Sequence, residues 1–372
     1  MAAPRARVRW RGRRPGRGAV GRWTACLLAV AACAAVACRK TPAPPRWSWQ
    51  PGGLSEVLAA ARAQGMSALV LVDASWCPTC HQLERDVFER NAGRVPADRI
   101  VGVRIDFDTP AGQEVAASYR VMGLPTSLVL DASGKELGRI EGFETADGWL
   151  AALDGALAGK DESTAVLARF AKSPDDPALA AEAGAVRLAH GEEEEGIRLL
   201  EQVRSTRGDA ARKPGIDATR TLGRWFFRVR HDDERALAFF QDGAARAAGD
   251  DAAWGFHYWT AMTLRELRRP DEALALLDRL ATEHVGLAEP IALKAEYLYM
   301  VGGDDAHALE LARKAAELKP TDDWNHYLVG VLAERTGDRE GALAAARRAV
   351  ELAPDEAIYA HLLERLEKLP AP

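Results

Sequence analysis

The stretch VDASWCPTC at Val72–Cys80, together with GLPT at Gly123–Thr126, decides the fold of the first half of this chain. An uninterrupted apolar run at Ala68–Val72 leads into the first stretch and has the composition of a strand buried on both faces. The residues that follow, to about Arg90, have helical spacing. The sequence therefore places two cysteines between a buried strand and the start of a helix.

The neighbouring segments extend this pattern into an α/β domain. Apolar and β-branched composition predicts strands at 100–107, 126–130 and 136–141, the last two as a hairpin around DASG. Helical spacing predicts helices at 54–64, about 111–119 and about 146–158. This order predicts a central mixed sheet flanked by helices over residues 54–160.

Residues 161–372 have a different composition, in which strand signals are absent and Ala, Leu, Glu and Arg dominate. Two units at the C-terminal end match with a shift of 34 residues. The matching positions are Gly303, Asp304, Ala308, Ala315 and Pro320, followed by Gly337, Asp338, Ala342, Ala349 and Pro354. The pattern resembles the tetratricopeptide (TPR) repeat, and less regular units upstream bring the expected number to about five helical hairpins. The segment after Pro354 is expected to supply a capping helix.

The N-terminus carries a strong charge asymmetry. The chain has a formal net charge of −5, yet residues 1–37 contain eight arginines and no lysine or acid, which leaves a net charge of −13 for residues 38–372. Nucleic-acid binding needs a concentrated basic face, so the acidic body argues against a nucleic-acid partner.

An arginine-rich segment followed by a short uncharged apolar run is typical of a secretory signal. The residues AVAC at 35–38 resemble the signal of a bacterial lipoprotein, which implies cleavage before Cys38 and lipidation of that residue; Cys33 is the alternative. Residues 1–37 are then the signal and 38–53 a Pro-rich tether. We expect a periplasmic protein held to the membrane by its lipid, or, as the alternative, by an uncleaved signal anchor.

The cysteine count favours redox chemistry. The chain has five cysteines, and processing at Cys38 leaves free thiols only at Cys77 and Cys80. Zinc sites use the same C-x-x-C spacing, but a tetrahedral site needs two further ligands and no second C-x-x-C exists in the sequence. We therefore expect neither a bound metal nor a cofactor other than the Cys77–Cys80 pair itself.

The position of the cysteines predicts a role for each. The N-terminus of a helix stabilises a thiolate, so Cys77 is the expected nucleophile. Cys80 lies one turn further along and is the expected resolving cysteine, which attacks the mixed disulfide. Pro78 suits the first turn of a helix, where its missing N–H costs nothing.

These motifs together resemble the thioredoxin family, over about residues 54–160. The WCPTC core, the HQLERDVF segment after it and the GLPT loop are similar in particular to the C-terminal periplasmic domain of DsbD-type electron relays. The resemblance implies that Leu124-Pro125 is a cis peptide bond and that the loop from Leu124 to Thr126 binds an extended substrate segment by strand addition. It also implies that Trp76 shields the disulfide and contacts partners, with simple packing as the alternative.

One position departs from the family pattern. The family has a buried Asp six residues before the first cysteine, where this chain has Leu71. Asp73 falls on the same face of the strand if the strand extends that far. Asp73, or Glu84 on the following helix, is a candidate proton relay for Cys80; the alternative is that both carboxylates face solvent.

Two functions fit the sequence. The first is a membrane-tethered thiol-disulfide oxidoreductase that receives electrons from an upstream thiol protein, acts on client disulfides and docks a partner on its repeats. The second is an adaptor that uses the thioredoxin-like domain as a binding module. An aromatic cluster in the repeat region either packs in the core or faces a ligand groove; it comprises Trp254, Phe256, His257, Tyr258 and Trp259.

Overall fold

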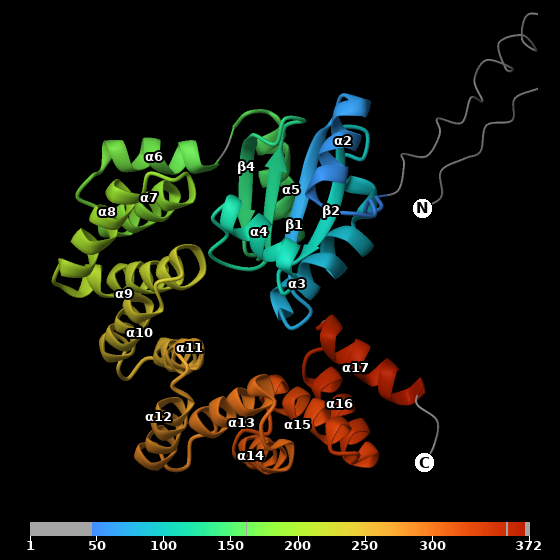
Figure 1. Cartoon of the computed structure of the whole chain (residues 1–372), viewed down its shortest axis with the longest axis vertical. Helices are drawn as coiled ribbons and strands as arrows, with labels where there is room; N and C mark the ends of the chain where they lie inside the picture. The colour runs from blue at the N-terminus through green and yellow to red at the C-terminus, as the bar shows by residue number, and fades with distance from the viewer. Residues whose placement is uncertain (1–46, 161, 355, 369–372) are drawn as a thin grey trace, which may run out of the picture. The chain divides into compact units, whose positions relative to one another are not determined.

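The computed structural model describes residues 47–160, 162–354 and 356–368, and begins with an α/β domain (Figure 1). Its sheet contains β1 (Ser67–Asp73), β2 (Ile100–Asp106), β3 (Thr126–Leu130) and β4 (Glu136–Glu141), in the order β2-β1-β3-β4. Strand β1 runs parallel to β2 and antiparallel to β3, and β3 pairs antiparallel with β4. The sheet is mixed, as the sequence predicts.

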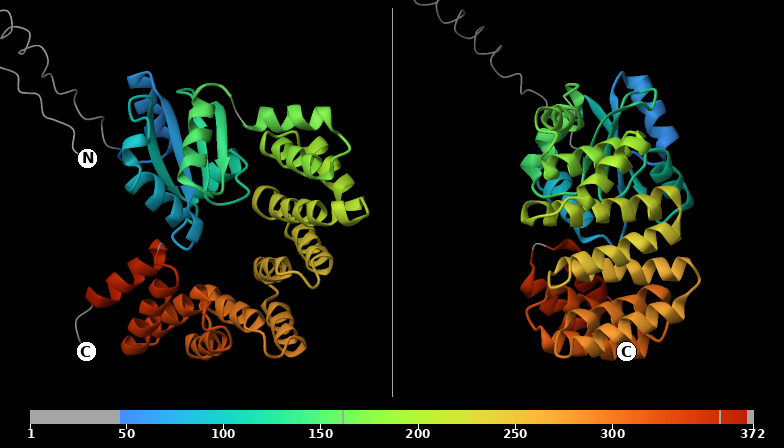
Figure 2. Two further views of the ribbon diagram at one scale, coloured as in Figure 1. Left: turned by 180° about the vertical axis from the view of Figure 1, so that it is seen from behind. Right: turned by 90° about the vertical axis from the view of Figure 1, so that its left-hand side faces the viewer.

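Helices cover both faces of this sheet (Figure 2). They are α2 (Leu54–Gln64), α3 (Pro78–Leu83) with its π-helical continuation η1 (Glu84–Glu89), the 3₁₀ turn η2 (Ala92–Arg94), α4 (Pro110–Ser118) and α5 (Ala146–Leu157). Val70 and Val72 of β1 enter the core beneath α2 and α4, whereas Leu69 and Leu71 enter the core beneath α3, η1 and α5. The alternation of side chains along a strand explains why β1 is apolar at every position.

Two tryptophans that precede α2, Trp47 and Trp49, contact the α/β domain. Trp49 forms an isolated parallel bridge with Gly102, and the rings of Trp47 and Trp49 lie 5.6 and 4.5 Å from that of Phe88. This part of the predicted tether (38–53) therefore packs on the domain, because burial of two indole rings favours an ordered segment. The predicted signal, Cys33 and Cys38 lie outside the described residues.

The described residues from 162 to 368 form helices joined by turns. Helix α6 (Glu162–Lys172) precedes five hairpins: α7 (Pro177–Ala189) with α8 (Glu193–Ser205), α9 (Asp209–Arg224, continued by the π-helical η3, Trp225–Arg230) with α10 (Asp233–Arg246), α11 (Ala252–Glu266) with α12 (Pro270–Glu283), α13 (Glu289–Val301) with α14 (Asp305–Leu318), and α15 (Asp323–Arg335) with α16 (Arg339–Leu352). Helix α17 (Ala357–Lys368) follows, and its Leu362 and Leu366 close the last core. The five hairpins and the capping helix agree with the sequence prediction.

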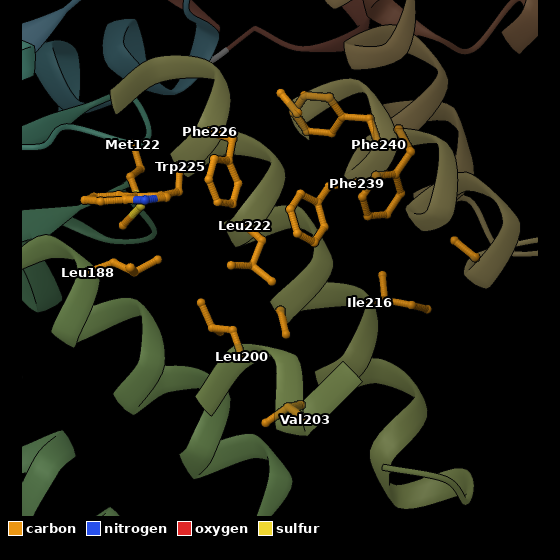
Figure 3. Packing of buried hydrophobic residues seen from close by; sticks show 14 of the residues in the cluster. Met122, Leu188, Leu200, Val203, Ile216, Leu222, Trp225, Phe226, Phe239 and Phe240 are labelled. Atoms are coloured by element: carbon orange, nitrogen blue, oxygen red, sulfur yellow. The ribbon is translucent and has the colours of Figure 1, made fainter. Parts of the chain in front are cut away.

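Aromatic side chains fill the first large core of this solenoid (Figure 3). Phe226 stacks on Phe239 with ring centroids 5.4 Å apart, and Phe240 is fully buried. Helices α10 and α11 approach closely at Gly243, where a Cβ atom would lie 2.1 Å from the ring of Phe256. Only glycine fits there without displacing a buried ring.

Several contacts join the solenoid to the α/β domain within one compact unit, residues 45–372. Met122 packs beside Trp225 in the solenoid core (Figure 3). The guanidinium of Arg228 lies 4.7 Å from the ring centroid of Phe107, and the rings of His81 and His361 are 6.2 Å apart. Among the described helices, none is both long and apolar enough to cross a membrane.

Candidate active site

The two cysteines form a disulfide at the C-terminal end of β1, with an Sγ–Sγ distance of 2.09 Å. Cys77 is the N-cap residue of α3, and its sulfur accepts a hydrogen bond from the backbone N–H of Cys80 at 3.2 Å. Cys77 is 4% exposed and Cys80 1% exposed. A sulfur at a helix N-terminus meets unpaired N–H groups, which favour its ionised form once the disulfide is reduced.

The GLPT loop lies beside this disulfide. Its Leu124-Pro125 peptide bond is cis, and Leu124 packs against the two cysteines. Thr126 pairs with Val72 in the β1–β3 ladder, so the loop ends where the cysteine motif begins. The side chain of Thr126 is buried, and its hydroxyl donates to the carbonyl of Gly123 at 2.8 Å, which fixes the turn.

Trp76 has both a packing contact and a polar contact. Its ring packs against the disulfide, and its indole N–H donates to the carboxylate of Asp108 at 2.6 Å. The side chain is only partly buried, so part of the ring faces solvent beside the cysteines. Asp108 thus orients Trp76, although Asp108 itself was not among the predicted site residues.

Asp73 is buried at the end of β1, with 4% of its surface exposed. The alternative in which Asp73 faces solvent is wrong, because β1 extends to Asp73 and its buried carboxylate accepts hydrogen bonds from Nε (2.8 Å) and Nη2 (2.5 Å) of Arg104. Burial raises the pKa of Asp73, and the neighbouring charge of Arg104 opposes that rise.

Glu84 belongs to the same cluster. Its Oε2 lies 3.6 Å from Nη1 of Arg104, and its Oε1 accepts a hydrogen bond from the indole of Trp49 at 3.2 Å. Burial raises the pKa of Glu84 as well, again against the charge of Arg104. The structure thus brings both candidate proton relays to one arginine on the α3 face of the sheet.

Arg104 was not among the sequence-predicted site residues, although a signal for it existed. It is the one charged residue within the otherwise apolar run Ile100–Ile105. The parallel pairing of β1 with β2 sets Leu71 opposite Arg104, and this pairing cannot be read from either strand alone.

His81 is held by a contact of 2.8 Å between its Nε2 and the carbonyl oxygen of Ser75. In the part of the chain that the structure describes, no group of three or more His, Cys, Asp or Glu residues could hold a metal ion.

Comparisons with known proteins agree with this geometry. Residues 54–157 match the family model of a thioredoxin-like domain. The thiol:disulfide interchange protein DsbD of Actinobacillus pleuropneumoniae is 34% identical over 92 residues, which cover 24% of this chain and 16% of that protein. DsbD 2 of Pseudomonas aeruginosa is 31% identical over 106 residues, covering 27% and 18%. The chain thus spans less than a fifth of the length of these curated relatives.

Among solved structures, the TPR protein YrrB is similar with a TM-score of 0.31 and 19% identity, covering 54% of this chain and 99% of YrrB. The family match and the hairpin architecture together describe the two parts of the molecule. Residues 54–157 form a thioredoxin-like domain that carries a CxxC disulfide, and the described helices that follow it form a solenoid of helical hairpins.

Proposed function

We propose that this protein is a thiol-disulfide oxidoreductase that acts on client proteins as a reductant or a disulfide relay, outside the cytoplasmic membrane and tethered to it by a lipid on Cys38. The observation that carries the proposal is the Cys77–Cys80 disulfide at the start of α3, beside the cis-proline loop. A scaffold alone needs neither thiol.

The reaction is a two-step exchange. In the reduced protein, the Cys77 thiolate attacks one sulfur of a client disulfide, forms a mixed disulfide and releases the first client thiolate. The Cys80 thiolate then attacks the Cys77 sulfur and releases the second. The client gains two electrons, and the protein ends with the disulfide seen in the structure. An upstream dithiol protein returns the two electrons, so the cycle needs no cofactor.

The residues around the disulfide support this cycle. Leu124 packs against the cysteine cluster, and the loop at Leu124-Pro125 would pair with an extended client segment next to Cys77. Asp73 or Glu84 would accept the proton of Cys80. Trp76 would contact the client beside the disulfide.

The solenoid would dock a partner protein. Helices α10, α11 and α12 line a cavity of about 860 Å³, with Trp254, His257 and His284 among its walls. Concave surfaces of stacked hairpins commonly bind peptides or helices. The aromatic cluster of α11 is thus divided: Phe256 is buried in the core, whereas Trp254 and His257 line this cavity.

The direction of electron flow is tested by titrating the Cys77–Cys80 pair against glutathione. A reductant or relay is expected to have a potential close to that of thioredoxin, about −270 mV, rather than close to the most oxidising family members, about −120 mV. Alkylation of the free thiols followed by mass spectrometry measures the reduced fraction. A reduction potential near about −120 mV would contradict the reductant role and identify an oxidant.

A further inference from the structure

A second cavity, of about 380 Å³, is lined by residues of the α/β domain and of the solenoid. Trp76 and Phe107 line one side of it, and both of these rings also pack against the two cysteines. Residues of η3 and α11 in the solenoid line the other side, among them Phe227, Tyr258 and Trp259. Trp76 and Phe107 therefore border both the cavity and the cluster that contains the reactive sulfurs.

Arg228 of η3 lines this cavity without a hydrogen-bond partner for its buried nitrogens. Its Nε and Nη1 atoms each expose less than 1 Å² and have no partner among the described residues. The guanidinium lies 4.7 Å from the ring centroid of Phe107 and 5.2 Å from that of Trp259. Aromatic faces attract a cation, but they do not replace the acceptors that a guanidinium fork requires.

The charge of Arg228 is only partly balanced by its surroundings. Burial, and next the nearby charge of Arg224, lower the pKa of Arg228 to about 10. No carboxylate of the described residues forms a hydrogen bond with Nε or Nη1 of Arg228. A buried cation without a partner is unfavourable unless a ligand supplies the opposite charge.

Asp108 and Tyr258 also line the cavity, and both act to raise the pKa of Arg228, although less strongly than burial lowers it. Asp108 accepts the hydrogen bond of Trp76, and Arg265 pairs with Glu266 at 2.5 Å. The remaining titratable groups of the lining are Tyr258, His231 and Asp233, and burial raises the pKa of both Tyr258 and Asp233. Arg228 is thus the cation left to recognise an incoming anion.

We propose that Arg228 binds an acidic side chain of the client polypeptide, close in sequence to the client cysteine that Cys77 attacks. This inference rests on the proposed function and adds a substrate preference to it. A carboxylate forms two parallel hydrogen bonds with a guanidinium, and the aromatic walls accommodate the methylene groups of a glutamate. Because Trp76 and Phe107 border both the cavity and the cysteine cluster, such a glutamate would lie within a few residues of the client cysteine.

The test uses pairs of disulfide-linked peptides that differ by one Glu-to-Gln replacement, at each of the three positions before and after the cysteine. The readout is kcat/KM for their reduction by the full chain. For at least one position, we expect the wild-type protein to prefer the Glu peptide by about 10-fold. In Arg228→Met, kcat/KM for that Glu peptide should fall to the value for its Gln partner.

Arg220→Met is the matched control. Arg220 lies two turns earlier on α9, pairs with Asp217 at 2.8 Å, lies over the ring of Phe256 and does not line the cavity. This variant should keep the preference for Glu. Arg228→Met should also melt no earlier than the wild type, because it removes an unpartnered buried charge, whereas a purely structural Arg228 would make the variant less stable.

Arg228→Gln provides a second variant should the methionine protein not fold. Equal kcat/KM for Glu and Gln peptides in the wild type at every position, or a preference that survives in both Arg228 variants, would overturn the inference. A wild-type protein that reduces none of the peptides would instead contradict the proposed function.

Discussion

Replacement of Cys77 by serine is expected to reduce the rate of insulin disulfide reduction to that of the assay without protein. The serine hydroxyl is not ionised at neutral pH, so it cannot replace the thiolate that the start of α3 stabilises. The side chain is buried and similar in size, so the fold should persist, which far-ultraviolet circular dichroism checks. Equal rates for Cys77→Ser and the wild type would eliminate the enzyme and leave the adaptor.

Cys80→Ser is the companion variant, with a different expected outcome. Cys77 can still attack a client, but nothing resolves the mixed disulfide, so the protein should accumulate covalently bound to its clients. Non-reducing electrophoresis would detect this adduct, and Cys77→Ser should form none. Adducts formed by Cys77→Ser but not by Cys80→Ser would reverse the assigned roles.

Asp73 and Glu84, the two carboxylates next to Arg104, are expected to accelerate the resolving step by accepting the proton of Cys80. The Cys80 thiol is almost fully buried, which disfavours its ionisation, so the resolving step needs a base. A protein with both Asp73→Asn and Glu84→Gln should resolve the mixed disulfide about 100-fold more slowly at neutral pH, the usual contribution of a general base. Rapid-quench measurement of mixed-disulfide decay gives this rate.

The pH profile separates this role from a structural one. Burial raises the pKa of both carboxyls, so each stays protonated, and inactive as a base, to a higher pH than an ordinary carboxyl. The wild-type resolution rate should therefore rise with pH through these raised pKa values and then level off. In the double variant it should rise only with ionisation of the thiol itself. Asp147→Asn, an exposed carboxylate on α5, is the control, and an unchanged profile in the double variant would remove the proposal.

Much of the α/β domain follows from local sequence. The apolar run before the motif, the glycine-bounded hairpin and the CxxC at a helix start each depend on residues a few positions apart. The strands at Thr126–Leu130 and Glu136–Glu141 accordingly have the predicted bounds. The hairpins of the solenoid follow from a repeat that the chain itself displays.

What the sequence could not show depends on pairing between distant segments. Arg104 meets Asp73 only because β2 aligns with β1 in one register. Trp76 donates its indole N–H to Asp108, which lies in the loop after β2. Phe107 of the α/β domain contacts the guanidinium of Arg228 in the solenoid. No periodicity within one segment records such contacts, so the cavity lined by Trp76 and Phe107 appears only in three dimensions.

The pH dependence of alkylation at Cys77 in the reduced protein tests most directly whether the start of α3 stabilises the Cys77 thiolate. Iodoacetamide reacts with the thiolate, so the midpoint of the rate against pH reports the pKa of this thiol. We expect a midpoint clearly below about 8.5, the ordinary value for cysteine. A midpoint at or above that value would show that the start of α3 does not stabilise the thiolate, which contradicts the proposed role of Cys77.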